Sequence, residues 1–192
     1  GAFVTAFAGS SDIFSRNGGA ETRTVNFLAA HDGFTLADLV SHTVKHNGAN
    51  GEDNRDGHDE NHSWNNGAEG ATTDGAVLSA RRADIKALLA SLFLSRGTIM
   101  LTAGDEGGRS QEGNNNAYCQ DNAITWMHWD QLDDGLIEHA AMLSTIRRRF
   151  PALGETTFLS GAGDVEWRTL AGAPMTVADW EAPFAGTLLV LL

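Results

Sequence analysis

The chain has 192 residues, of which 42% are hydrophobic, and a formal net charge of −12 at pH 7. This apolar content is enough for a buried core, which excludes disordered and fibrous classes. The negative charge repels phosphate backbones and anionic lipids, and the only tight basic cluster is Arg147, Arg148 and Arg149. We therefore expect no nucleic-acid partner and no membrane partner, and we assign the basic cluster to a helix end.

Cys119 is the only cysteine, so no disulfide can form within the chain. We interpret it as a partly buried small residue and not as a nucleophile, since no base is implied beside it. The sequence has no apolar run of about 18 residues and no basic stretch followed by an apolar segment at its start. It predicts neither a membrane span nor a signal peptide, and the expected compartment is the cytoplasm.

The first part of the chain predicts a loop and then a strand. Residues 1–23 are rich in Gly, Ser and Ala and predict a loop with at most one short helical turn. The largely apolar run 24–30 predicts a buried strand, which ends at the turn signal formed by His31, Asp32 and Gly33.

A helix is expected over 36–46, with Thr35 as its N-cap. Residues 47–76 contain many Asn, Asp, Gly and Glu and few large apolar side chains, which predicts a long loop. Loops of this length inside compact domains tend to be functional.

A second helix is predicted over 81–96, ended by Gly97. Its apolar residues recur at steps of three and four and share one face: Ile85, Leu88, Leu89, Leu92 and Phe93. Residues 98–103 then predict a second buried strand that leads into Asp105 and Glu106.

A second polar loop is expected over 107–122, followed by a helix over 135–149 that Pro151 blocks from continuing. Beyond Pro151, alternating segments and turns predict a β-rich domain. The final apolar run, 186–192, is the kind of strand that needs neighbouring strands on both sides.

This order of strands and helices predicts an α/β fold with a parallel sheet covered on both faces. Active sites in such sheets collect at the carboxyl ends of the strands. His31 and Asp32 follow the first strand, and Asp105 and Glu106 follow the second. These four residues are therefore candidates for chemistry.

The residue types leave several roles open. A carboxylate at a strand end can be a nucleophile, a general acid or base, or a group that binds sugar hydroxyls. Asp32 also fits an ordinary Asp-Gly turn, and His31 fits a strand-end histidine that bonds only to backbone.

Four segments in order carry a resemblance. They are 25–35, 46–57, 97–106 and 113–122, which read VNFLAAHDGFT, HNGANGEDNRDG, GTIMLTAGDE and GNNNAYCQDN. The first resembles a signature of the α-amylase superfamily, and all four together resemble its isoamylase and glycogen-debranching branch. The likeness extends from about Gly9 to the carboxyl end.

The resemblance implies a (β/α)8 barrel followed by a β-sandwich. On this basis residues 1–151 are the carboxy-terminal part of the barrel, its last strand-helix units, and residues 152–192 begin the sandwich. The activity implied is hydrolysis of α-1,6 branch linkages in glycogen or limit dextrin with retention of configuration. No cofactor is implied.

Residue by residue, Asp32 matches the family's third catalytic carboxylate, which stabilises the transition state, and His31 matches the histidine that binds the sugar. A whole barrel takes about 250 residues, so the nucleophile and the general acid are expected upstream of Gly1. We expect the piece to be inactive alone, and to be marginally stable or to self-associate through uncovered strand edges. Asp105 and Glu106 are expected to anchor a loop.

Other sites are weighed by spacing and residue type. His42 and His46, and His58 and His62, have a spacing that zinc accepts, but a metalloprotease motif is missing, and a calcium loop centred on Gly57 lacks its final Glu. No metal site is predicted.

Asn114 and Asn115 are candidates for binding sugar hydroxyls, with backbone satisfaction as the equal alternative. Trp64 is a candidate for stacking on a sugar, whereas Trp126 and Trp129 are assigned to the core. The rival functions are a carbohydrate-binding or assembly module without chemistry, and a sibling α-glucan hydrolase.

Overall fold

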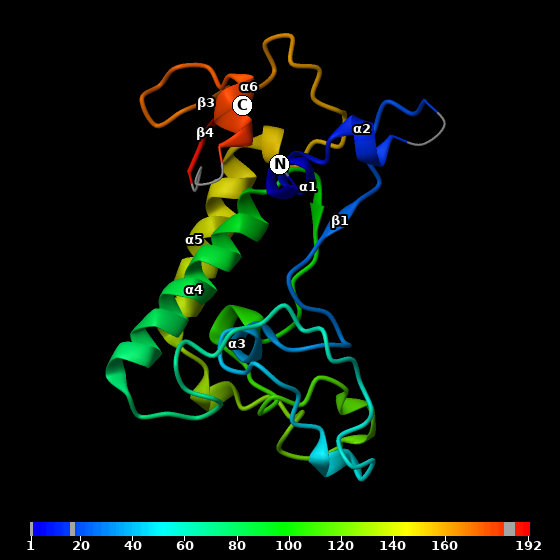
Figure 1. Ribbon diagram of the computed structural model, residues 1–192, viewed down its shortest axis with the longest axis vertical. Coiled ribbons are helices and arrows are strands. Elements are labelled where there is room, and N and C mark those ends of the chain that lie inside the picture. Colours follow the sequence, from blue (N-terminus) through cyan, green and yellow to red (C-terminus); the bar gives the residue numbers. More distant parts are fainter. Residues whose placement is uncertain (1, 16–17, 183–186) are drawn as a thin grey trace. The chain divides into compact units, whose positions relative to one another are not determined.

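The computed structural model describes residues 2–15, 18–182 and 187–192 (Figure 1). The described α-helices are α1 (Ala2–Ala8), α2 (Ser11–Phe14), α3 (Leu36–Leu39), α4 (Gly75–Leu94), α5 (Asp134–Arg149) and α6 (Val177–Glu181). The 3-10 helices are η1 (Gly48–Asn50), η2 (Asp105–Gly107), η3 (Ala117–Cys119), η4 (Trp129–Gln131) and η5 (Pro151–Leu153). The strands are β1 (Val25–Asn26), β2 (Thr98–Ile99), β3 (Glu166–Arg168) and β4 (Leu189–Leu191). The fold is thus mixed α/β with few strands in the described chain.

The chain divides into two compact units. Unit 1 comprises Gly1–Asn26, Leu94–Thr98 and Arg148–Leu192, and unit 2 comprises Phe27–Phe93 and Ile99–Arg147. Each unit combines segments that are distant in sequence. The domain boundary placed at residue 151 stays a prediction.

Unit 2 is built on α4 and α5, which run side by side in the same direction (Figure 1). Arg82 near the start of α4 pairs with Asp133 at 2.8 Å, and the Arg147 guanidinium near the end of α5 donates to the carbonyl of Phe93 at 2.8 Å. The two helices and α3 enclose one apolar core: Leu36, Val40, Ile85, Leu89, Phe93, Leu136 and Leu143. The periodicity that predicted the apolar face of α4 is confirmed.

The caps explain where the long helices begin. The Asp74 carboxylate accepts from the backbone N–H of Ala76 at 2.8 Å, so α4 begins at Gly75, several residues before the predicted start. Asp133 does the same for Gly135 at 2.8 Å, and α5 spans Asp134–Arg149, within one residue of the prediction. The arginine cluster forms its last turn, as predicted.

The helix predicted over 36–46 is wrong beyond its first turn. Thr35 caps α3 as expected, accepting from the N–H of Asp38 at 3.2 Å, but α3 ends at Leu39. Further along, the Glu69 carboxylate accepts the backbone N–H groups of Thr43 and Val44, at 3.0 Å and 3.3 Å. These amides therefore have a side-chain partner in place of helical carbonyls, and the chain leaves the helix.

The two strands predicted as buried, over 24–30 and 98–103, are shorter than expected and partly exposed. β1 covers only Val25–Asn26 and β2 only Thr98–Ile99, and in the described chain each has the other as its single strand neighbour. Val25 is 48% exposed, and Phe27 is 55% exposed. Apolar composition predicted burial, but burial requires elements on both faces, and the described residues do not supply them.

Unit 1 is held together by Arg96, which is 4% exposed and donates to the backbone carbonyls of Ala152 and Thr157. Its strands β3 and β4 pair antiparallel, with Trp167 opposite Val190, and the Trp167 ring packs edge-on against Trp180. Strands were predicted at both places. Among the described residues β4 has one strand neighbour, β3, instead of two.

Three predictions of burial are wrong. Cys119 is exposed, and so are Trp126 and Trp129, at 57% and 71%. All three lie in or beside short 3-10 turns of the loop that precedes α5, where no long helix face turns them toward the core. Residue type alone therefore overestimated their burial.

Candidate functional site

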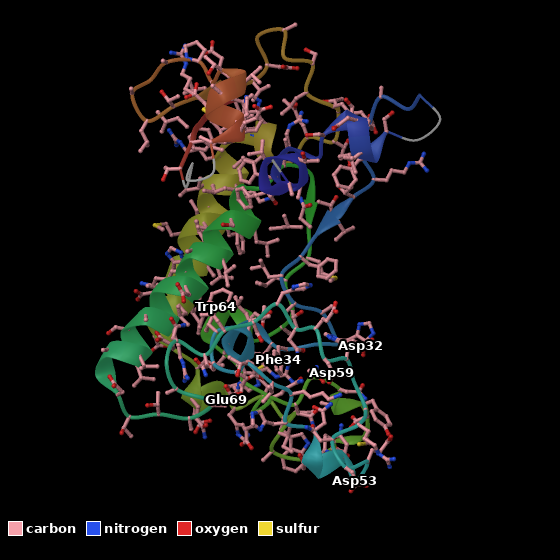
Figure 2. All side chains as sticks on the ribbon, in the orientation of Figure 1. Asp32, Phe34, Asp53, Asp59, Trp64 and Glu69 are labelled. Carbon is pink, nitrogen blue, oxygen red and sulfur yellow. The ribbon has the colours of Figure 1, made fainter. Side chains whose placement is uncertain are left out.

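The strongest candidate site is the turn of His31 and Asp32, which lies in unit 2 a few residues after β1. The side chains of His31 and Asp32 are 91% and 72% exposed, and His31 Nε2 lies 3.3 Å from Asp32 Oδ2. Figure 2 shows Asp32 at the periphery of this unit. A carboxylate displayed in this way is free to receive hydrogen bonds from a hydroxyl-rich ligand.

The backbone on both sides of this turn is fixed by neighbouring loops. Before the turn, the Thr102 hydroxyl donates to the carbonyl of Ala29 at 2.8 Å. After it, the N–H of Gly33 donates to the carbonyl of Asn115 at 2.8 Å. Gly33 is buried and has φ of +94°, a conformation that other residues adopt at a cost. The exposed side chains therefore stand on an anchored backbone.

Asp105, the second candidate carboxylate, is a buried anchor. It is 1% exposed, and its Oδ1 accepts from the N–H of Leu36, at the first turn of α3, at 3.0 Å. Burial raises the pKa of Asp105 to about 7. The neighbouring Glu106 carboxylate accepts from the N–H of Gly104 at 2.9 Å. These bonds agree with the loop-anchoring role expected for the pair.

Next to the turn lies a group of side-chain amides, three of them buried, which we call the amide cluster: Asn47, Asn50, Asn114 and Asn115. Asn47 is completely buried, and Asn114 and Asn115 are each 1% exposed. Asn47 Nδ2 donates to Asn115 Oδ1 at 2.8 Å, and Asn47 Oδ1 accepts the backbone N–H of Asn115 at 3.0 Å. Asn114 Nδ2 donates to Asn50 Oδ1 at 2.8 Å. The cluster joins the two long polar loops.

Asp56 places a carboxylate beside the amide cluster. Its Oδ2 accepts from the amides of Asn50 and Asn116, at 2.6 Å and 3.0 Å. The Asn50 bond is the main reason that the pKa of Asp56 lies below its usual range, against the opposing effect of burial. These hydrogen bonds therefore favour the ionised form of the Asp56 carboxyl group.

The structure separates the four predicted site residues into two groups. His31 and Asp32 face solvent together, whereas the amides of Asn114 and Asn115 bond inside the protein. Asn115 Nδ2, for example, donates to the carbonyl of His58 at 2.9 Å and to Asn61 at 2.7 Å. Direct binding of sugar by Asn114 or Asn115 stays a prediction.

A pocket of about 800 Å³ also lies in unit 2, and neither His31 nor Asp32 lines it. Several of its polar residues are already paired. His46 contacts the Glu69 carboxylate at 3.0 Å, and Arg82 contacts Asp133 at 2.8 Å. Burial acts to raise the pKa of Glu69, but hydrogen bonds from His46, Thr43 and Asn65 outweigh it and hold the pKa below its usual range. The Glu69 contacts fix the loop between α3 and α4, and the Arg82–Asp133 pair links α4 to the start of α5.

Metal ligands do not gather in the described part of the chain. Within residues 2–15, 18–182 and 187–192, no group of three or more His, Cys, Asp and Glu side chains is arranged to hold a metal ion. His42 and His46 pack edge to face with their ring centroids 5.1 Å apart, as neighbouring aromatic groups do. Likewise, none of the described helices is both long and apolar enough to cross a bilayer.

Comparison with known proteins gives consistent matches. The chain is 54% identical over 182 residues to a glycogen debranching enzyme of Pectobacterium atrosepticum, which covers 94% of this chain and 28% of that protein. It is 53% identical over 183 residues to the glycogen debranching enzyme of Cronobacter sakazakii, covering 95% and 28%. The enzyme of Klebsiella pneumoniae subsp. pneumoniae is 51% identical over 182 residues, with 94% and 28% covered. No family model matches the chain.

By sequence, this chain is a relative of the glycogen debranching enzymes. It spans about 28% of the length of these relatives. The activity for which the debranching enzymes are named therefore belongs to longer proteins, and its transfer to this chain is a proposal.

The resemblance to debranching enzymes drew attention to Asp32 and His31 but missed Asn47 and Gly57. Both lie in the segment 46–57, which the sequence analysis used as a family signature and to test for a calcium loop, and not for contacts with Asn115. A Cβ placed on Gly57 would lie 2.4 Å from Asn115 Oδ1 and 2.8 Å from Asn47 Nδ2. A glycine inside an Asn-rich motif was the available signal, because it marks a close approach of backbone to side chains.

Proposed function

We propose that this chain is a segment of a retaining glycoside hydrolase that cleaves α-1,6 branch linkages in glycogen-like glucans. The observation that carries the proposal is its identity of 50% or more with glycogen debranching enzymes over nearly its whole length. The exposed, anchored carboxylate of Asp32 supports it, because a sugar must reach this group. The proposal includes the barrel-and-sandwich architecture, with residues 1–151 and 152–192 as its two parts.

In the proposed mechanism Asp32 binds hydroxyl groups of the sugar whose bond is cleaved. Positive charge develops on that sugar in an oxocarbenium-like transition state, and hydrogen bonds to its hydroxyls strengthen at that point. An anionic acceptor held in place stabilises this state more than the ground state. His31, whose ring lies beside Asp32, donates to the same sugar.

Retaining hydrolysis also needs a nucleophile and an acid, whose carboxyl groups stand about 5 Å apart. Asp105 has a pKa of about 7, which would suit an acid, but its carboxyl group is buried and bonded to the N–H of Leu36. It is therefore unsuited to meeting a glucan. We infer that the two reacting carboxyl groups come from other parts of a longer protein and that this chain alone does not turn over glycogen.

The test has two parts. The purified 192-residue chain is incubated with glycogen limit dextrin, and we expect no release of reducing ends. In parallel, the chain replaces its matched segment in the Pectobacterium atrosepticum enzyme, and this chimera should debranch. Asp32→Asn should remove most of the activity of the chimera, whereas Asp53→Asn should not, since Asp53 is also an aspartate, has an 89% exposed side chain and pairs with Arg55.

Each result has a distinct meaning. Turnover by the chain alone that disappears in Asp32→Asn would show that a complete catalytic set lies within these residues. A folded but inactive chimera would contradict the debranching role. Binding of glucan by the isolated chain, with an inactive chimera, would favour a carbohydrate-binding module instead.

A further inference from the structure

We propose that Asn47 is a positioning residue for Asp32, acting through Asn115. The starting observation is that the backbone just after Asp32 is tied to one residue of a distant loop. The N–H of Gly33 donates to the carbonyl of Asn115 at 2.8 Å, and Gly33 is buried. Where Asn115 moves, the turn that carries Asp32 must follow or lose this bond.

Asn115 in turn is clamped by Asn47 at two points. The Asn47 amide accepts the backbone N–H of Asn115 at 3.0 Å and donates to its side-chain oxygen at 2.8 Å. Such a paired contact fixes the orientation of Asn115 as well as its distance. Asn47 is completely buried, so water does not compete for these bonds.

Asn47 is itself held in place by two further hydrogen bonds. Its backbone N–H donates to Asn54 Oδ1 at 2.7 Å, and its Nδ2 also donates to the carbonyl of Asp56 at 3.0 Å. The bonds therefore run in one continuous path from residues 54–56, through Asn47 and Asn115, to Gly33. A rigid support of this kind is what a transition-state-binding group needs, since small displacements weaken catalysis.

Gly57 lies directly against the contact between Asn47 and Asn115. This residue has φ of +68°, and a Cβ on it would fall 2.4 Å from Asn115 Oδ1 and 2.8 Å from Asn47 Nδ2. Asn47 and Asn115 can approach each other here only because residue 57 has no side chain. Gly57→Ala should therefore push the pair apart without removing either amide.

The first experiment measures hydrogen exchange of the Gly33 amide in the full 192-residue chain by NMR. Asn47→Ala should raise the exchange rate of the Gly33 amide by at least about tenfold, because the carbonyl of Asn115 that accepts this N–H is no longer held in place. Gly57→Ala should act in the same direction. The catalytic consequence rests on the proposed function: in the chimera, kcat should fall by about tenfold or more while KM changes by less than about twofold.

Two control variants separate positioning from general weakening. Asn66→Ala also removes a side chain that donates two hydrogen bonds in unit 2. These bonds go to the carbonyl of Val40 and to Asp84, and neither involves Asn47 or Asn115. Gly51→Ala adds a Cβ to a glycine with φ of +77° that has nothing within 4 Å. Neither control should change Gly33 exchange or the ratio of kcat to KM.

Unchanged exchange at Gly33 in a folded Asn47→Ala chain would overturn the proposal, and so would an equal increase in the Asn66→Ala control. If the chimera with the unaltered chain does not debranch, the proposed function fails, whereas the exchange result still decides whether Asn47 positions the turn. Faster exchange in both Asn47→Ala and Gly57→Ala, with silent controls, would support it.

Discussion

The turn of His31 and Asp32 and the amide cluster belong to the same unit but are built in opposite ways. The turn exposes its polar side chains almost fully, whereas Asn47, Asn114 and Asn115 are buried and bonded to one another or to nearby loops. Exposed polar groups contribute little to stability, and buried ones are costly to disturb. The comparison teaches that the proposed chemistry and the observed rigidity lie on different residues, which are joined by the hydrogen bond from Gly33 to Asn115.

The largest effect is expected at Asp32, on activity alone. In the chimera, Asp32→Asn should lower kcat/KM by about 10³-fold, since one group that binds the transition state is lost. Because the side chain is 72% exposed, the unfolding free energy should change by less than about 0.5 kcal/mol. Steady-state kinetics and chemical denaturation measure the two quantities. A large loss of stability would contradict the contrast between the two regions.

The amide cluster should show the reverse behaviour. Asn115→Ala removes bonds to Asn47, Asn61 and His58 and leaves buried groups unsatisfied, so the unfolding free energy should fall by about 3 kcal/mol. Urea denaturation of the purified chain tests this expectation. The kinetics of the Asn115→Ala chimera are measured below its melting temperature. A rise in its KM for glucan would favour the prediction that Asn115 binds sugar directly.

Asp105 provides a pH-dependent test of buried anchoring. Burial raises its folded-state pKa from an ordinary value near 3.8 to about 7, so between these pH values the folded chain holds a proton that the unfolded chain has released. As pH rises through this window, the contribution of Asp105 to the unfolding free energy therefore decreases. Asp105→Asn removes this pH dependence. The unfolding free energy of the variant minus that of the unaltered chain should therefore increase by up to about 1.4 kcal/mol per pH unit.

Denaturation at several pH values between about 4 and 8 gives this difference directly. The increase should level off once pH exceeds the folded-state pKa of about 7. A difference that is constant with pH would mean that the pKa of Asp105 is the same in the folded and the unfolded chain.

The smallest effect is expected at Thr35, which links the turn to α3. Its hydroxyl accepts from the N–H of Asp38 at 3.2 Å, so Thr35→Ala should reduce the unfolding free energy by about 1 kcal/mol. Thr35→Ser keeps the hydroxyl, so its unfolding free energy should differ from that of the unaltered chain by no more than about 0.3 kcal/mol. Equal losses in both variants would assign the effect to the Thr35 methyl group and its packing.

Local patterns predicted the elements that depend on local interactions. The apolar spacing of Ile85, Leu89 and Phe93 predicted the core face of α4, and Thr35 was identified as the cap of α3. The helix over 36–46 failed because Glu69, from a segment far along the chain, binds the N–H groups of Thr43 and Val44. Such a competitor is invisible to periodicity, since it acts only once the loop has folded.

The candidate site divides in the same way. Asp32 and His31 were identified from a short signature, because the residues of a turn adjoin in sequence. Asn47 was missed because its importance lies in its bonds to Asn115, which is 68 residues away. Gly57 is important for the same spatial reason.

The sequence by itself determined the relationship to glycogen debranching enzymes, the exposed turn as a candidate site, and the apolar faces of the long helices. Side-chain type and spacing are sufficient for these, since they rest on identity and on helical geometry. Only the tertiary structure decided that Asn114 and Asn115 are buried, that Asp105 bonds to the N–H of Leu36, and that the Asp32 turn is tied to Asn47 through Asn115. Burial and hydrogen-bond partners depend on which distant segments meet, and this is fixed by packing of the whole unit.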